Sequence, residues 1–280
     1  MNINNIIIDE LITNALKEDI GTGDITTNTT IPEDKTAAGR FIAKEDGIIC
    51  GLDVCERVFK ILDDNIKFTA NKKDGEFIKT GEIIAAVSGN ARNVLTAERT
   101  AINLLQRMSG IATQTSKVVA QVSGTKAKIA DTRKTTPSLR VLEKYAVKTG
   151  GGTNHRFNLA DGILIKDNHI TAAGGIINAV ERARENAPHT LKIEVECETM
   201  KDVEDAIAAK VDIIMLDNMS NEDMKKAMDF INGRAVTEAS GNMGDKDLRA
   251  VAETGVDIIS IGALTHSARS LDISLKFNLS

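Results

Sequence analysis

The segment from Asp131 to His169 holds seven cationic and four acidic side chains and therefore carries a charge of +3. The whole chain carries −5, so all other residues together sum to −8. A cationic segment in an acidic protein indicates a site for an anionic ligand. Its charges stand in three short polar clusters, TRKTT, GGGTNHR and IKDNH, beside glycine, asparagine and histidine. The alternative is a solvated charged surface.

Downstream of that segment, a polar residue ends each of several apolar runs. The runs end at Glu196, Asp217, Glu238 (followed by Ser240) and Ser260, at intervals of 21, 21 and 22 residues. A repeat of about 22 residues is close to the smallest strand-plus-helix unit, and near-continuous apolar strands belong to buried parallel sheets. The pattern predicts a β/α barrel. Because the active sites of such barrels lie at the C-terminal ends of the strands, we expect these residues to meet at one rim.

The barrel is expected to be open or incomplete. Residues 111–267 hold about seven such spacings at most, fewer than the eight units of a full barrel. A chain of 280 residues favours two domains, and the first hundred residues mix strands and helices irregularly, which is typical of an α+β domain. A helix is predicted over 91–108, ended by Ser109 and Gly110.

The rim residues suit three kinds of ligand group. Arg133, Lys134 and Arg156 match carboxylate or phosphate, which guanidinium groups bind in a bidentate way. Glu196 and Asp217 suit Mg²⁺ or ribose hydroxyls, since Mg²⁺ takes one or two carboxylates plus substrate oxygens. The turns ASGNMG and SIGA open helices whose first amides can hold a phosphate. The predicted site therefore takes a phosphate, a diphosphate–metal centre and an anionic second substrate.

Each of these residues also has a structural explanation. Arg133 and Arg156 can serve as ion-pair partners, and His155 as a hydrogen-bonded core histidine. The strand-end acids can cap the helices that follow them. Glu194 and Glu238 are assigned a structural role. The roles of His169 and His266 stay open between structure and function.

Composition excludes several classes of protein. Aromatic residues make up 3% of the chain and Trp is absent, which argues against a binder of single-stranded nucleic acid. A net charge of −5 argues against DNA binding. Three cysteines without a CxxC motif indicate neither a disulfide framework nor a zinc site. No signal peptide or membrane-length apolar run is visible, so we expect a cytoplasmic protein without membrane contact.

Seven segments together resemble the quinolinate phosphoribosyltransferases, in order and over nearly the whole chain: EDIGTGDITT, ERTAINLLQRMSGIAT, DTRKTTPSLRVLEKYAVKTGGGTNHRFNLADGILIKDNH, IEVEC, IIMLDNM, EASGNM and IISIGALTHS. The resemblance implies an α/β fold with an N-terminal α/β sandwich domain and an open α/β barrel of about six strands, of the type II phosphoribosyltransferase kind. It places the sandwich at residues 1–110, with 270–280 packed back on it, and the barrel at 111–269. Ser138 and the Asn242–Met243 pair depart from the family pattern at uncharged positions.

The resemblance also implies an activity. Quinolinate and 5-phosphoribosyl-1-diphosphate would give nicotinate mononucleotide, diphosphate and CO₂, in NAD biosynthesis, with Mg²⁺ as cofactor. The enzyme would be a homodimer in which Arg99 reaches the site of the neighbouring subunit. Lys134, Lys166, Glu196 and Asp217 would be catalytic, and the last two would hold the metal. The implied substrate-binding positions are Arg99, Thr132, Arg133, Lys134, His155, Arg156, Lys166, Glu196, Asp217, Ser240, Gly241, Asn242, Ser260, Ile261, Gly262 and Ala263.

Three other functions stay open. A related phosphoribosyltransferase would act on nicotinate or another ring acid, although a dicarboxylate accounts better for Arg99, Arg133, His155 and Arg156. A sensor of phosphoribosyl ligands would not need both Glu196 and Asp217. A barrel aldolase or isomerase would need a lysine placed for a Schiff base, or a clear acid–base pair.

Overall fold

The structure is a computed structural model that describes residues 5–279, and it forms two compact units. The first unit holds the chain up to Ser116, Thr136–Gly151 and the residues from Ser267 onward. The second unit holds Lys117–Thr135 and Gly152–His266. The predicted ranges 1–110 with 270–280, and 111–269, stay a prediction. No helix within 5–279 is both long enough and apolar enough to cross a membrane.

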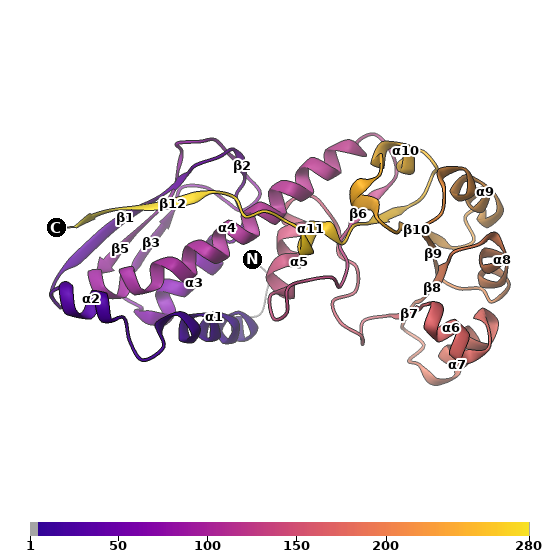
Figure 1. Ribbon diagram of the computed structural model, residues 1–280, viewed down its shortest axis with the longest axis horizontal. Coiled ribbons are helices and arrows are strands. Elements are labelled where there is room, and N and C mark those ends of the chain that lie inside the picture. The colour runs from indigo at the N-terminus through magenta and orange to yellow at the C-terminus, as the bar shows by residue number, and fades with distance from the viewer. Residues whose placement is uncertain (1–4, 280) are drawn as a thin grey trace. The chain divides into compact units, whose positions relative to one another are not determined.

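A four-stranded antiparallel sheet forms the centre of the first unit, in the order β12–β1–β5–β3. The last strand of the chain therefore lies beside the first one (Figure 1). Every second residue of β1 is buried, which is the pattern of a sheet with one covered face. The strands are β1 (Thr36–Ala43), β3 (Lys67–Ala70), β5 (Ile83–Asn90) and β12 (Ile273–Leu279), with a separate pair β2 (Gly47–Ile48) and β4 (Phe77–Ile78).

Helices cover the inner face of this sheet. Phe59 on α3 packs with Phe41 of β1 and Phe68 of β3, with ring centroids 6.2 and 6.3 Å away. These rings concentrate the unit's few aromatic side chains in one core. The helices are α1 (Asn5–Ile20), α2 (Ile25–Thr30), α3 (Leu52–Leu62), α5 (Arg140–Thr149) and the larger part of α4 (Ala91–Gln121).

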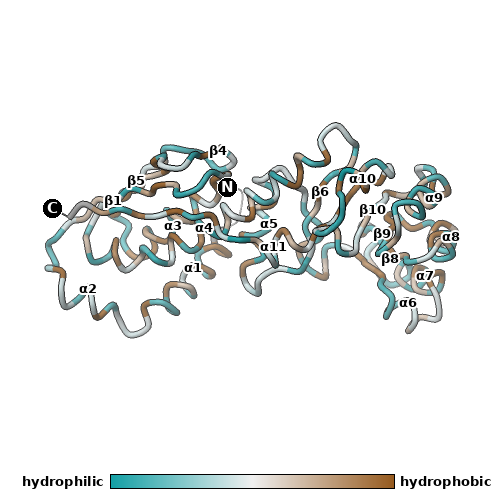
Figure 2. The backbone as a smooth tube through the Cα atoms, turned by 45° about the horizontal axis from the view of Figure 1, so that its top comes forward, coloured by the Kyte–Doolittle hydropathy of each residue, from teal (hydrophilic) through white to brown (hydrophobic). Residues whose placement is uncertain are grey.

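The prediction that Ser109 and Gly110 end a helix is wrong, because α4 continues to Gln121. Figure 2 shows the tube of α4 alternating between apolar and polar residues along its length. A Cβ at Gly110 would lie 2.0 Å from the carbonyl oxygen of Arg269. The glycine is therefore needed for a close backbone approach within the first unit, not for a helix end.

A six-stranded parallel sheet, in the order β6–β11–β10–β9–β8–β7, forms the second unit. β6 and β7 stand at the two ends and do not pair with each other among residues 5–279, so the barrel is open. The predicted fold class is confirmed. The strands are β6 (Lys128–Ala130), β7 (Ile163–Ile165), β8 (Ile193–Cys197), β9 (Ile213–Asp217), β10 (Val236–Ser240) and β11 (Ile258–Ser260).

Helices follow these strands and lie outside the sheet (Figure 1). Thr199 and Ser220 cap α8 and α9 by accepting from backbone N–H groups three residues on. These caps follow Glu196 and Asp217 in sequence, so neither acid is itself the cap. The helices are α6 (Asp167–Ala173), α7 (Ile176–Asn186), α8 (Met200–Ala208), α9 (Asn221–Ile231), α10 (Leu248–Ala252) and α11 (Ala263–His266), with a 3₁₀ turn η1 (Met243–Asp245).

Candidate active site

A pocket of about 520 Å³ opens at the C-terminal ends of the strands of the second unit, at the rim that the strand repeat predicts. Arg99 lies exposed on α4 of the first unit and is not among the residues that line this pocket. Ile261, Gly262 and Ala263 do not line it either. The predicted site residues that do line it are Thr132, Arg133, Lys134, His155, Arg156, Lys166, Glu196, Asp217, Ser240, Gly241, Asn242 and Ser260.

Asp131, the first residue after β6, organises the floor of this pocket. Its side chain is fully buried and accepts hydrogen bonds from Asn154 Nδ2 at 2.6 Å and from the backbone N–H of His155 at 2.9 Å. The segment around Thr153 also bridges β6 in parallel at Ala130. Two segments about twenty residues apart are thereby held together, and the GGGTNHR cluster is fixed against the TRKTT cluster.

Arg156 is held by its own loop. Its Nη1 donates to the carbonyl oxygen of Gly162 at 2.8 Å, and Asp161 closes the loop by accepting from the backbone of Phe157 at 2.8 Å. Burial lowers the pKa of Arg156, and the nearby Arg133 lowers it further. Two guanidinium groups close enough to repel each other form a receptor for an anion.

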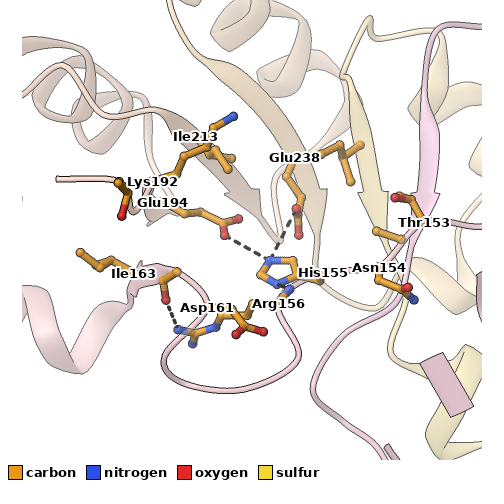
Figure 3. Close-up of a pocket in the computed structure, with 14 residues that line it drawn as sticks. Thr153, Asn154, His155, Arg156, Asp161, Ile163, Lys192, Glu194, Ile213 and Glu238 are labelled. Atoms are coloured by element: carbon orange, nitrogen blue, oxygen red, sulfur yellow. Dashed lines mark hydrogen bonds and ion pairs between the residues drawn. The ribbon is translucent and has the colours of Figure 1, made fainter. Parts of the chain in front are cut away.

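The imidazole of His155 lies between two buried carboxylates (Figure 3). Its Nε2 is 3.1 Å from Glu194 Oε2 and 3.8 Å from Glu238 Oε2. The other ring nitrogen, Nδ1, accepts a hydrogen bond from the backbone N–H of Arg156 at 2.8 Å. An accepting nitrogen carries no proton, so this hydrogen-bond network assigns His155 as the neutral tautomer with its proton on Nε2.

That tautomer decides against a metal ion at this cluster. His155, Glu194 and Glu238 bring ligand atoms within 4.8 Å of one another. A metal-binding histidine, however, donates its other N–H outward, whereas Nδ1 of His155 accepts. The arrangement therefore suits a proton shared among buried groups.

Glu238 is a buried acid with a raised pKa. Burial, reinforced by the like charge of Glu194, raises its pKa to about 7, although His155 and a hydrogen bond from Ser260 act in the opposite direction. Oε1 of Glu238 and Oε1 of Glu194 are buried and accept no hydrogen bond from the described part of the chain. With this pKa, the carboxyl group of Glu238 is protonated in about half of the molecules at pH 7.

Nearer the rim, the acids meet cations and amides. Lys166 Nζ donates to Glu196 Oε2 at 2.6 Å. Asp217 accepts from Asn218 Nδ2 at 2.5 Å. His169 holds the start of α6, because its Nδ1 accepts from the backbone N–H of Lys166 at 3.0 Å. The last contact gives His169 a capping role.

Comparison with known proteins identifies the family and supports the fold. The model of the quinolinate phosphoribosyl transferase C-terminal domain matches residues 111–276, and that of the N-terminal domain matches residues 24–109. The chain belongs to the quinolinate phosphoribosyl transferase family. It is 45% identical to a probable nicotinate-nucleotide pyrophosphorylase (carboxylating) of Bacillus subtilis, over 99% of this chain and 96% of that one.

Two further members of the family are equally similar along their length. A probable nicotinate-nucleotide pyrophosphorylase (carboxylating) of Synechocystis is 43% identical, over 97% of this chain and 92% of that protein. The crystal structure of NadC from Streptococcus pyogenes has a TM-score of 0.94 and 42% identity, and the match covers all of this chain and 99% of that one. The resemblance found in the sequence is therefore confirmed.

In this member of the quinolinate phosphoribosyl transferase family, a second acidic group fits a metal ion. Glu196, Glu198 and Asp217 bring carboxylate oxygens within 4.8 Å of one another. All three ligands are oxygens, which Mg²⁺ prefers, and they lie at the rim, where substrate oxygens can complete the coordination. This donor set fits Mg²⁺, whereas the histidine-containing cluster below it does not.

The turn after β10 is built to keep its backbone open. Gly241 has φ +92°, and a Cβ there would lie 2.2 Å from Oδ1 of Asn218. Asn242 follows in the left-handed region at φ +51° and begins the 3₁₀ turn. Only glycine allows Asn218 to lie this close while it also contacts Asp217.

The turn after β11 is arranged differently. The N–H of Ile261 donates to the carbonyl oxygen of Ala130 at 2.9 Å, so that amide is already engaged. Gly262 lies beneath Lys134, since a Cβ there would be 2.9 Å from the lysine Cδ. Thr265 fixes the same lysine by donating to its carbonyl oxygen at 2.8 Å. His266 packs against Gly262 on the other side.

Sequence reasoning missed four residues that the structure brings into or beside this site. Glu194 and Glu238 were assigned to structure, although both contact His155. A visible signal was the alternation on IEVEC, where Glu194 and Glu196 stand two residues apart and so face the same side of one strand. Glu198 and Asn218 come just after strand ends, and that position was their only signal.

Proposed function

We propose that this protein transfers the phosphoribosyl group of 5-phosphoribosyl-1-diphosphate to quinolinate, forming nicotinate mononucleotide, diphosphate and CO₂ in NAD biosynthesis. One observation carries the proposal: a single pocket combines Arg133 and Arg156 with Glu196 and Asp217. The paired cations suit a dicarboxylate, and the acids suit ribose hydroxyls and a diphosphate-bound Mg²⁺. The names of its relatives in Bacillus subtilis and Synechocystis support the same activity.

In the proposed reaction, Arg133 and Arg156 bind the ring carboxylates and orient the ring nitrogen toward C1 of the ribosyl donor. The nitrogen displaces diphosphate through an oxocarbenium-like state. Lys134 and Lys166 stabilise the charge on the leaving group, which is electrostatic catalysis in a preorganised site. The pyridinium charge then stabilises the electron pair that stays on C2 when the C2–carboxylate bond breaks and CO₂ leaves, and that pair takes up a proton at C2.

Glu196 and Asp217, with Glu198 beside them, would hold the Mg²⁺ of this reaction, and the ion would supply positive charge to the diphosphate oxygens. The ion pair between Lys166 and Glu196 keeps that acid turned toward the rim. Removal of the ion with a chelator, followed by titration back of Mg²⁺, separates its contribution from that of the two lysines.

The proposed enzyme is a homodimer in which Arg99 from one copy completes the site of the other. Its support is that Arg99 is exposed on the first unit and does not line the pocket of the second. Mixing inactive Arg99→Ala protein with inactive Glu196→Ala protein should restore activity, because mixed dimers hold one intact site. A monomer in sedimentation, with no restored activity, would rule the shared site out.

The decisive assay supplies 5-phosphoribosyl-1-diphosphate and Mg²⁺ with either quinolinate or nicotinate, and measures nicotinate mononucleotide and CO₂. We expect both products from quinolinate and no mononucleotide from nicotinate. Mononucleotide from nicotinate alone would identify a relative with another ring-acid substrate. Binding of the ribosyl donor without turnover of either acid would identify a sensor.

A further inference from the structure

A second cavity, about 320 Å³, lies in the same barrel toward the opposite ends of the strands. Its walls include Ile163, Ile213 and Ile258, which are the first residues of β7, β9 and β11. We call it the lower cavity, and the pocket at the strand C-termini the upper pocket. The described residues that line both are His155, Arg156 and Glu238.

Glu238 is the carboxyl group at this junction. Its side chain is 3% exposed, yet it lines both the upper pocket and the lower cavity, and its Oε1 accepts no hydrogen bond from residues 5–279. Burial and the facing Glu194 raise its pKa to about 7, so its acid form is well populated at neutral pH. Several titratable, charged or hydroxyl groups face Glu238 or share its cavities. Two come from neighbouring strands, Glu194 on β8 and Ser260 on β11. The others are Asp131, Arg133 and Lys134 after β6; His155, Arg156 and Asp161 in the loop before β7; Lys192 before β8; and Lys166, Glu196 and Asp217 at the C-terminal ends of β7, β8 and β9.

The other proton carriers of the upper pocket include His155 and two lysines. His155 directs its Nε2 proton at Glu194 and accepts at Nδ1. Lys166 donates one of its three protons to Glu196 at 2.6 Å. Lys134 and Lys166 therefore remain as competitors of Glu238 for the role of an acid facing a bound ring.

We propose that Glu238 is a catalytic residue that protonates C2 of the ring when CO₂ leaves. The inference rests on the proposed function. The C–C bond electrons remain on C2 as CO₂ departs, the O–H bond of Glu238 breaks, and its proton forms the new C–H bond. Glu238 is left as a carboxylate, and water in the lower cavity returns a proton to it. The net reaction consumes one proton from solvent.

The position of Arg156 supports this assignment. Arg156 lines both cavities as Glu238 does, and its guanidinium is a binding group for a ring carboxylate. A substrate carboxylate bound at Arg156 would lie in the upper pocket that Glu238 also lines. An ionised Glu238 would repel that carboxylate, so binding of the dicarboxylate itself favours the acid form.

The test compares Glu238→Gln with Glu253→Gln, which removes an exposed acid of α10 within the same unit. Loss of a general acid should lower the turnover of Glu238→Gln about 100-fold or more. Quinolinate affinity should change less than about threefold, since the amide keeps the shape of the side chain. In Glu238→Gln, diphosphate should be released faster than CO₂, and the dicarboxylate mononucleotide should accumulate in quenched samples. Labelled CO₂ should exchange into that mononucleotide.

The pH dependence of the wild-type reaction is a second test, and it does not depend on whether a variant folds. Wild-type kcat/KM for quinolinate should fall through an apparent pKa of about 7 as the acid form of the free enzyme is lost, and Glu238→Gln should lack that limb. Turnover of Glu238→Gln within threefold of wild type, or a wild-type profile without the limb, overturns the proposal. Accumulation of the intermediate in Lys134→Gln but not in Glu238→Gln assigns the proton to Lys134 instead. A wild-type protein that forms no mononucleotide refutes the proposed function itself.

Discussion

Two layers of acids inside one barrel behave differently, although both face its interior. Glu194 and Glu196 stand two residues apart on β8, and their side chains are 6% and 11% exposed. Glu196 pairs with Lys166 at 2.6 Å, whereas Glu194 lies 3.1 Å from the imidazole of His155, which also approaches Glu238. The two acids of one strand therefore have different partners, an ammonium group for Glu196 and an imidazole shared with a second acid for Glu194.

The difference also separates two kinds of chemistry. The upper acids, Glu196, Glu198 and Asp217, offer charged oxygens to a metal ion and ribose. The lower acids, Glu194 and Glu238, are buried on either side of His155, and burial beside Glu194 raises the pKa of Glu238 to about 7. Along a strand, every second side chain faces the same side of the sheet, so acids two residues apart, such as Glu194 and Glu196, both face the barrel interior at different depths.

The largest expected effect comes from removing the cation that lines both cavities. Arg156→Ala should raise the quinolinate dissociation constant about 100-fold or more, because it leaves desolvated carboxylates unpaired. Calorimetric titration with quinolinate measures it, with Arg249→Ala on the exposed α10 as the control. An affinity within threefold of wild type would show that the carboxylates bind elsewhere.

The next effect concerns stability and tests the charge state of the lower layer. Glu238 has a folded-state pKa of about 7 and a usual value of 4.5, so the folded protein holds a proton that the unfolded chain releases. That contribution is present below about pH 4.5 and lost as pH rises through 7, on the order of 3 kcal/mol in total. The Glu238→Gln variant has no carboxyl group at this position, so it should not lose this stability as pH rises.

Thermal melting of wild type and Glu238→Gln at pH 5 and pH 8.5 measures that difference. The variant should gain stability relative to wild type at the higher pH. The Glu253→Gln variant reports any general consequence of losing an acid. Equal shifts at both pH values would mean that Glu238 is ionised throughout, and would place it with the upper layer.

A smaller effect is expected in the upper layer. Glu196→Gln should raise the Mg²⁺ concentration for half-maximal turnover about tenfold, since a neutral amide replaces one charged ligand. Titration of Mg²⁺ into metal-free enzyme is the measurement. An unchanged Mg²⁺ response would confine Glu196 to its ion pair with Lys166.

The smallest effect belongs to Glu198. It lies exposed in the loop after β8, and Mg²⁺ needs only one or two carboxylates, so Glu198→Gln should shift the Mg²⁺ requirement by about two- to threefold. The same titration serves for both variants. A shift as large as that of Glu196→Gln would make Glu198 an equal ligand and move the metal outward along the rim.

Much of the second unit could be predicted from its sequence, because a strand repeat of 21 to 22 residues constrains where each side chain emerges. Glu196, Asp217 and Ser260 were predicted as neighbours from strand ends alone, and they line one pocket. The role of Gly110 could not be predicted, because the backbone it contacts lies far away in sequence, at Arg269. The periodicity of a sequence predicts the helix or strand to which a residue belongs, but not which residues far away in the sequence it contacts.

The partners of the buried acids were the second limit. Nothing in the string IEVEC shows that Glu194 approaches His155 while Glu196 pairs with Lys166, since those partners come from other segments. The perturbation of Glu238 likewise depends on Glu194, His155 and Ser260, which come from three separate segments. Such properties arise from tertiary packing, so a single sequence conceals them.

An open barrel leaves two free strand edges, and their length bears on how this protein avoids association with misfolded chains. β6 and β7, at the two ends of the sheet, have three residues each, whereas β8, β9 and β10 have five. Short edges offer few unpaired backbone groups to an incoming strand. The bridge from Thr153 to Ala130 shields β6 further. Lengthening β7 would therefore offer more unpaired backbone groups for pairing with a second chain.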